Sequence, residues 1–182
     1  MINRVLLCLG LLLTVNVAAE EQRLAHAGED QENWITYGHG HANQRFSALE
    51  QINPGNLASL TPAWIYQTGI IGTFPTNPLV VDGVMYLTTP YNHVVALDAA
   101  SGAEQWRYEH VLSQKKLCCG SHNRGLAWGY GRLYMVTADA RFIALDAATG
   151  ALVWDIPMVD PGSAEPGDLD SIRHFSEQRR AD

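Results

Sequence analysis

Short apolar runs alternate with turn residues through the middle of the chain. Residues 84–87 and 133–136 are apolar, and each run follows a pair of turn residues, Asp82-Gly83 and Tyr130-Gly131. Runs of this length, rich in β-branched and aromatic residues and bounded by turns, predict β-strands. No part of this stretch has the 3.6-residue period of a helix. Two further strands are expected, at residues 93–97 and 141–145.

These strands belong to an internal repeat. Residues 80–107 align without a gap on residues 128–155 at an offset of 48 residues, with 11 identities in 28 positions. In both copies a short turn begins at an Asp and ends at a Gly. The Asp carboxylate can accept backbone N–H bonds inside such a turn, and glycine can adopt its left-handed position.

A tryptophan stands near the end of each copy, at Trp106 and Trp154. A period of roughly 40–50 residues with about four short strands is typical of β-propeller blades. A large flat side chain at a fixed place can pack on the turn of the next blade, and the matched spacing disfavours a β-sandwich. The sequence therefore predicts an all-β fold, a partial β-propeller with antiparallel meanders over residues 61–155. Trp154 is expected to be more exposed than Trp106 because it has no following blade.

The first 19 residues read as a signal peptide. Arg4 precedes an apolar run, and the small residues up to Ala19 offer a cleavage site. The run is too short for a membrane-spanning helix. We therefore expect Sec-type export to the periplasm and no membrane span after cleavage. Residues 20–60 are expected to lead into the propeller, residues 61–159 to hold its repeats, and residues 160–182 to form a polar tail.

Composition excludes several classes of protein. The chain has 182 residues, of which 47% are hydrophobic and 17% charged, so it is not a disordered sequence. The 12 basic and 19 acidic residues argue against nucleic acid or an anionic membrane as a partner. There is no dinucleotide-type glycine loop and no serine nucleophile elbow. His39 and His41 are expected to be loop residues, because two histidines alone are a weak metal signal.

The residues with the most distinctive chemistry are Cys118, Cys119 and Arg124. Adjacent Cα atoms lie about 3.8 Å apart, closer than the roughly 4.4–6.8 Å of ordinary disulfides. Two buried thiols, an intermolecular disulfide and half of a metal site are therefore all open readings. Zinc ligand pairs normally have two or more residues between them, and free thiols are unusual in a secreted chain.

The chain resembles the alcohol dehydrogenases that use pyrroloquinoline quinone (PQQ), which are eight-bladed propellers. The motif Ala-x-Asp-x-x-Ser/Thr-Gly-x-x-x-Trp occurs twice, and a Cys-Cys pair precedes Asn-Arg-Gly. The resemblance covers roughly residues 33–159. It implies a disulfide between Cys118 and Cys119 that lies against the quinone ring, and contact of Arg124 with the quinone oxygens. It also implies oxidation of a small-molecule alcohol by hydride transfer, calcium or another metal ion in the whole enzyme, and a cytochrome c as candidate electron acceptor.

The sequence departs from this family in two ways. Pro75 stands where many members place a cofactor-binding Glu, and the adjacent Thr76 and Asn77 offer hydrogen bonds. Only two repeats are recognisable, so the chain is expected to lack the family's catalytic base and metal ligands and to be inactive alone. A truncated gene model, a split enzyme and a relic are all open explanations. The alternative function is a non-catalytic propeller scaffold of the outer-membrane assembly type.

Overall fold

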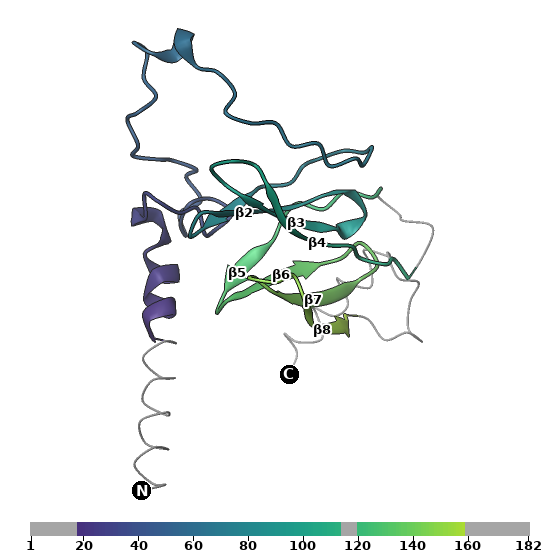
Figure 1. Ribbon diagram of the computed structural model, residues 1–182. Helices are drawn as coiled ribbons and strands as arrows, with labels where there is room; N and C mark the ends of the chain where they lie inside the picture. Colours follow the sequence, from purple (N-terminus) through teal and green to yellow (C-terminus); the bar gives the residue numbers. More distant parts are fainter. Residues whose placement is uncertain (1–17, 114–119, 159–182) are drawn as a thin grey trace, which may run out of the picture.

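The computed structural model describes residues 18–113 and 120–158. Their strands form two four-stranded antiparallel sheets, one after the other along the chain (Figure 1). The first sheet has the order β1 (Leu79–Val81), β2 (Val84–Thr88), β3 (Val94–Asp98), β4 (Glu104–Tyr108). The second has the order β5 (Ala127–Gly129), β6 (Arg132–Val136), β7 (Arg141–Asp146), β8 (Leu152–Pro157). Both sheets are simple meanders, which confirms the predicted all-β fold.

Each sheet opens with a tight hairpin. Asp82 and Gly83 join β1 to β2 with φ angles of 50° and 80°, and Tyr130 and Gly131 join β5 to β6 with φ angles of 53° and 67°. Two successive left-handed residues form the hairpin turn whose twist matches that of the strands. The turn residues seen in the sequence therefore form the first hairpin turn of each sheet and directly precede β2 and β6, as predicted.

The two sheets are equivalent copies, as the repeat predicts. Ala96 pairs with Trp106 in the first sheet, and Ala144 pairs with Trp154 in the second. Both sheets carry a register shift directly after that alanine. Trp106 and Trp154 therefore hold the same position in their sheets.

A single hydrophobic core joins the sheets. Leu79 and Val94 from the first sheet and Leu133, Ile143 and Leu145 from the second are all almost completely buried in one cluster. Burial of a side chain of this size stabilises a fold by about 1.5–3 kcal/mol. The core thus holds the two blades together as one unit.

Trp106 docks the first sheet on the second. Its indole Nε1 donates to the backbone oxygen of Ala147 over 3.1 Å, and the Tyr86 hydroxyl donates to the same oxygen, also over 3.1 Å. The indole lies against Gly150, where an added Cβ would be 2.5 Å from Cε3 of Trp106. The turn between β7 and β8 is therefore the docking seat, and only glycine leaves room for the indole.

Trp64 makes the same kind of contact one sheet earlier. Its Nε1 donates to the backbone oxygen of Ala99 over 3.2 Å, and its ring lies 2.5 Å from where a Cβ on Gly102 would be. The sequence analysis missed this role because the turn motif that precedes the other two tryptophans is absent before Trp64. Residues 61–78 contain no strand longer than an isolated bridge, so the regular strands begin at Leu79 and not at residue 61.

The two repeat tryptophans fall within the same broad range of exposure, so the greater exposure expected for Trp154 stays a prediction. Trp106 and Trp154 are both half-buried. Trp154 donates no hydrogen bond to a turn within the described ranges, but Phe142 of β7 packs edge-on against it with 4.9 Å between ring centroids. The equivalent position in the first sheet is Val94. The larger side chain in the second sheet therefore covers the indole.

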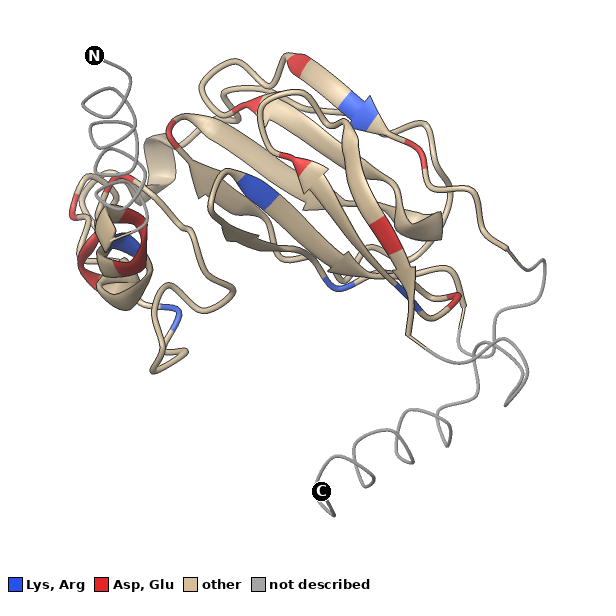
Figure 2. Cartoon of the chain, turned by 90° about the horizontal axis from the view of Figure 1, so that it is seen from below, with Lys and Arg blue, Asp and Glu red and all other residues tan. Residues whose placement is uncertain are grey.

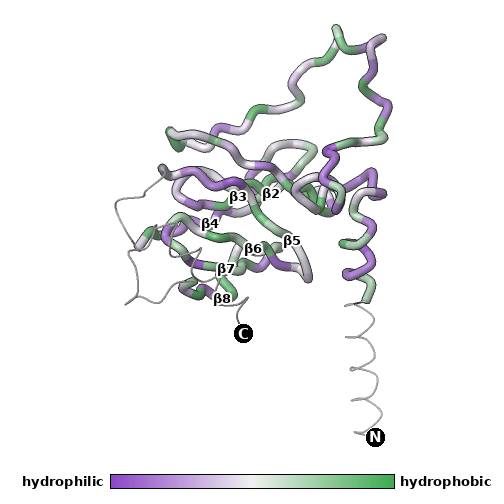
Figure 3. Tube along the Cα trace, turned by 180° about the vertical axis from the view of Figure 1, so that it is seen from behind, coloured by the Kyte–Doolittle hydropathy of each residue, from purple (hydrophilic) through white to green (hydrophobic). Residues whose placement is uncertain are grey.

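Much of the chain before β1 is a long loop that runs away from the two sheets and returns to them (Figure 1). It includes the 3₁₀ helix η2 (Leu57–Ser59). Apolar residues occur along it (Figure 3), and Ile65 and Ile71 are 81% and 96% exposed. Single exposed apolar residues are ordinary, but a series of them gives this loop an apolar surface that the described residues leave uncovered.

Helical residues 18–25 contact the hairpin turns of both sheets. Arg23 forms a bidentate ion pair with Asp82 at 2.6 and 3.0 Å, and its guanidinium lies 5.1 Å from the ring centre of Trp128. Glu20 accepts the N–H of Gly131 over 3.2 Å. This helical segment therefore bridges the two blades at one end of the sheets.

Charged residues are scattered over turns and strands, with several acids on the helical segment (Figure 2). Within the described ranges no helix is long and apolar enough to cross a membrane. The predicted polar tail and residues 1–17 of the predicted signal peptide lie outside these ranges.

Candidate functional site

A groove of about 940 Å³ lies against the second sheet and the segment that leads into it. Its polar wall includes Tyr37, His122 and Arg124, and its apolar wall includes Val136 and Phe142. Volumes of roughly 300–1,000 Å³ are typical of small-molecule sites. No Asp or Glu is found among the described residues that line it, and Arg124 is the Lys or Arg among those same residues.

The Arg124 side chain is exposed in this wall. Within the described part of the chain its guanidinium has no carboxylate partner and no hydrogen bond. Its backbone, in contrast, is held: the oxygen accepts the N–H of Asn77 over 3.1 Å. A cation in a groove whose described lining holds no acid attracts anionic ligands, and the planar guanidinium can bind two oxygens at once.

The segment of Pro75, Thr76 and Asn77 does not supply the groove with ligand donors. Thr76 Oγ1 lies 2.9 Å from Thr88 Oγ1, and Asn77 Nδ2 donates to the backbone oxygen of Tyr37 over 2.5 Å. None of these three residues lines the groove. They tie the long loop to the first sheet and place it beside Arg124.

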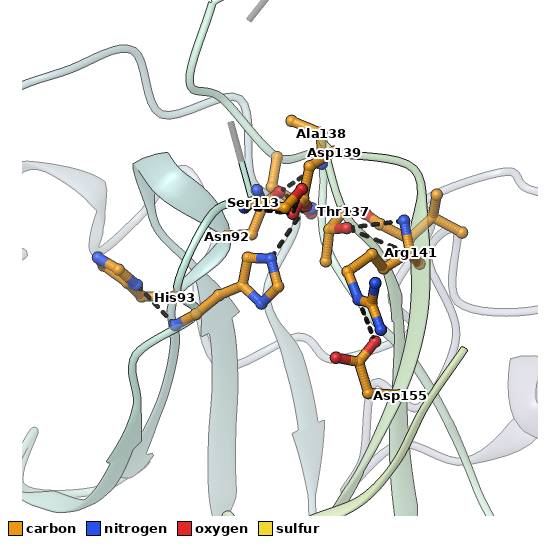
Figure 4. A network of polar contacts seen from close by, with 11 residues as sticks. Asn92, His93, Ser113, Thr137, Ala138, Asp139, Arg141 and Asp155 are labelled. Carbon is orange, nitrogen blue, oxygen red and sulfur yellow. Dashed lines mark hydrogen bonds and ion pairs between the residues drawn. The ribbon is translucent and has the colours of Figure 1, made fainter. Parts of the chain in front are cut away.

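A buried polar network stands next to the groove, at the turn between β6 and β7 (Figure 4). Asp139 is 3% exposed; its Oδ1 lies 2.9 Å from Nε2 of His110, and its Oδ2 accepts the N–H and the hydroxyl of Ser113, each over 2.9 Å. Burial raises the pKa of Asp139, but hydrogen bonds from Ser113, Thr137 and His110 outweigh that effect and lower the pKa to about 2. The carboxylate is therefore ionised at neutral pH and anchors the chain at Ser113.

A second histidine completes this network (Figure 4). Nδ1 of His93 accepts the backbone N–H of His110 over 3.0 Å. Burial lowers the pKa of His93, which favours the neutral ring that such an acceptor requires.

The two loop histidines of the sequence analysis do not form a metal site with their described neighbours. Both ring nitrogens of His39 lie 2.7 Å from backbone oxygens, those of Asp30 and Phe46. No group of three or more His, Cys, Asp or Glu residues that is able to hold a metal occurs in the described ranges.

Of the predicted cofactor-binding residues, only Arg124 is described, and the structure places it in the groove. Cys118 and Cys119 lie outside the described residues. The sequence analysis missed Tyr37 and Asn92, which also line the groove. The repeat alignment could have pointed to Asn92, because the equivalent residue of the second copy is Ala140. The two copies therefore differ in polarity at one turn position.

Comparisons with known proteins identify a family and several relatives that resemble this chain. Residues 34–157 match the family model described as the β-propeller domain of PQQ glucose/ethanol/alcohol dehydrogenases. The chain is 40% identical over 146 residues to the dehydrogenase subunit of a quinone alcohol dehydrogenase from Gluconacetobacter polyoxogenes, covering 79% of this chain and 20% of that one. It is 38% identical over 161 residues to the quinohemoprotein alcohol dehydrogenase ADH IIB from Pseudomonas putida, covering 86% and 23%.

Solved structures give the same result. The quinohemoprotein alcohol dehydrogenase from Comamonas testosteroni superposes with a TM-score of 0.70 at 34% identity, over 83% of this chain and 24% of that one. A europium-containing methanol dehydrogenase superposes with a TM-score of 0.70 at 36% identity, over 76% and 25%. The chain thus spans about a fifth to a quarter of the length of these relatives.

Proposed function

Because the chain belongs to the β-propeller family of PQQ-dependent glucose/ethanol/alcohol dehydrogenases, we propose that it is the N-terminal portion of a PQQ-dependent alcohol dehydrogenase. The reaction is oxidation of a small-molecule alcohol by hydride transfer to the quinone. We also propose that the protein is exported to the periplasm, on the basis of the apolar N-terminal run after Arg4.

The groove around Arg124 carries the proposal. PQQ is a flat molecule with three carboxylates and an ortho-quinone, so it presents mainly hydrogen-bond acceptors and negative charge. A groove of about 940 Å³ fits such a ligand in size. It also fits in charge, because its described lining holds an arginine and no acid, and that arginine has no carboxylate partner among the described residues. When bound, PQQ supplies the group that accepts the hydride.

Arg124 has two tasks in this proposal. Its guanidinium binds oxygens of the cofactor, and it remains charged at any physiological pH. A cation that is already in place stabilises negative charge as it develops, without a cost of reorganisation. Cys118 and Cys119 are proposed to form the disulfide that lies against one face of the ring.

We propose that the remaining catalytic groups lie in a region that the relatives have and that this chain does not cover. These groups are the base that takes the alcohol proton and the ligands of calcium or another metal ion. In this proposal the chain alone contributes residues that bind the cofactor but does not catalyse alcohol oxidation. A cytochrome c is the proposed electron acceptor of the complete enzyme.

The test is PQQ binding to the purified chain, measured by equilibrium dialysis with wild type, Arg124→Ala and Arg132→Ala. Arg132 is exposed and does not line the groove, so it controls for the loss of one positive charge. We expect Arg124→Ala to weaken binding by about tenfold or more, equal to about 1.4 kcal/mol, and Arg132→Ala to change it less than about twofold. Equal affinity of wild type and Arg124→Ala would refute the assignment, and no binding by wild type would favour the scaffold function.

A further inference from the structure

Asn92 combines two unfavourable features in one buried residue. It is completely buried, yet its Nδ2 has no hydrogen-bond partner in the part of the chain that the structure describes. Its φ of 62° and that of Tyr91, 68°, are left-handed, which is uncommon for residues other than glycine. Unsatisfied buried polar groups and backbone strain concentrate at functional sites. Asn92 also lines the groove that contains Arg124.

The orientation of the Asn92 amide is determined by its neighbours. Its Oδ1 accepts hydrogen bonds from Nδ2 of Asn123 over 3.0 Å and from the N–H of Ala138 over 3.2 Å. Both neighbours are donors, so an amide turned by 180° would set N–H groups against N–H groups. The Asn92 oxygen therefore makes the hydrogen bonds, and this orientation leaves the Nδ2 group without a partner among the described residues.

Asn123 passes this restraint to the arginine. Its Nδ2 also donates to the backbone oxygen of Val136 over 3.0 Å, and its Oδ1 accepts the N–H of Gly125 over 3.0 Å. The amide side chain thus closes a small loop around Arg124, whose two chain neighbours are Asn123 and Gly125. The Nδ2 of Asn123 thereby ties this loop to Asn92, in the turn before β3, and to Val136 of β6.

The internal repeat shows that the turn itself does not require an asparagine. The residue equivalent to Asn92 in the second sheet is Ala140, which has a φ of 57°. An alanine therefore takes the left-handed φ at the equivalent residue, although Asp139 before it does not share the left-handed φ of Tyr91. The amide of Asn92 consequently has a purpose other than forming the turn.

We propose that Asn92 is a positioning residue for Arg124, acting through the side chain of Asn123. The inference rests on the proposed function, in which Arg124 binds the oxygens of PQQ. By linking the turn before β3 to the segment before β5, the Asn92–Asn123 amide pair fixes the backbone from which the guanidinium enters the groove.

The experiment compares Asn92→Ala with wild type in the full chain. Asn43→Ala is the control, because Asn43 is an exposed asparagine with a left-handed φ of 51° outside the groove. Three quantities are measured: the dissociation constant for PQQ by equilibrium dialysis, the hydrogen exchange rate of the Gly125 amide, and the urea midpoint of unfolding. We expect Asn92→Ala to weaken PQQ binding by about tenfold. The urea midpoint should also fall, because two buried hydrogen bonds to the amide oxygen are lost. Gly125 exchange should speed up by about tenfold more than this change in midpoint accounts for. Asn43→Ala shares the backbone cost of an alanine with a left-handed φ but should alter neither PQQ binding nor the excess Gly125 exchange.

The outcomes separate this inference from the proposed function. If wild type binds PQQ and Asn92→Ala binds equally well, the positioning role is refuted while the proposed function stands. If wild type does not bind PQQ, the proposed function fails, and Gly125 exchange then decides the inference. Exchange in Asn92→Ala that is no faster than the change in midpoint accounts for would overturn the coupling from Asn92 to the arginine loop, and excess exchange would support it.

Discussion

The docking of Trp106 on Gly150 can be tested by adding one methyl group. Gly150 has a φ of 72°, so Gly150→Ala places an alanine in the left-handed region at a cost of about 1–2 kcal/mol. The new Cβ would lie 2.5 Å from Cε3 of Trp106 and displace the indole, and overpacking of this kind costs about 1–3 kcal/mol. Displacement also breaks the bond from Nε1 of Trp106 to Ala147, worth about 1 kcal/mol. We expect the free energy of unfolding in urea to fall by about 3–6 kcal/mol.

Gly131→Ala is the matched control for this substitution. Gly131 has a similar φ of 67°, but nothing lies within 4 Å of an added Cβ. Gly131→Ala should therefore lower the free energy of unfolding only by the backbone cost of about 1–2 kcal/mol. In a Trp106→Ala background the cost of Gly150→Ala should fall to that of Gly131→Ala, because the indole is gone. Equal losses for the two glycine variants in the wild-type background would refute the docking interpretation.

Three further predictions concern charge, redox state and activity. Asp139→Asn should lower the free energy of unfolding at pH 7 by about 2 kcal/mol. Because the pKa of Asp139 in the folded protein is about 2 against an ordinary 3.8, wild type should lose this stability as the pH falls from about 4 to about 2. A variant that is destabilised equally at both ends of that pH range would contradict the assignment. The exported protein should show no alkylatable thiol after denaturation, whereas two modified cysteines per chain or a disulfide-linked dimer would exclude a bond between Cys118 and Cys119. The 182-residue chain supplied with PQQ and calcium should not oxidise alcohols measurably, since metal ions normally contribute several kcal/mol to such chemistry; turnover would show that the chain assembles a complete site.

The blades were predictable because their information is local. Turn pairs such as Asp82-Gly83 and the alternation of apolar residues define each hairpin within about ten residues. The repeat then doubles the evidence, since each strand is seen twice. The equivalent pairs of Ala96 with Trp106 and Ala144 with Trp154 follow from that register alone.

Contacts between distant segments were not predictable in the same way. Trp64 reaches Ala99 across 35 residues without a turn motif before it. Asp139 meets His110 across 29 residues, and no spacing rule connects them. The cover that Phe142 gives Trp154 depends on one side chain that differs between the repeats. Packing and loop geometry decide these contacts, and neither has a period in the sequence.

The differences between the repeat copies are more informative about function than their identities. Positions shared by both copies, such as Ala96 and Ala144, serve the sheet that both copies build. Asn92 and Ala140 hold equivalent positions and both have a left-handed φ, so a left-handed φ at this position does not by itself require an asparagine. Only the asparagine stands beside Arg124 in the groove. A repeat protein therefore offers its own control at each position, and a buried polar residue in one copy opposite an alanine in the other directs attention to the site.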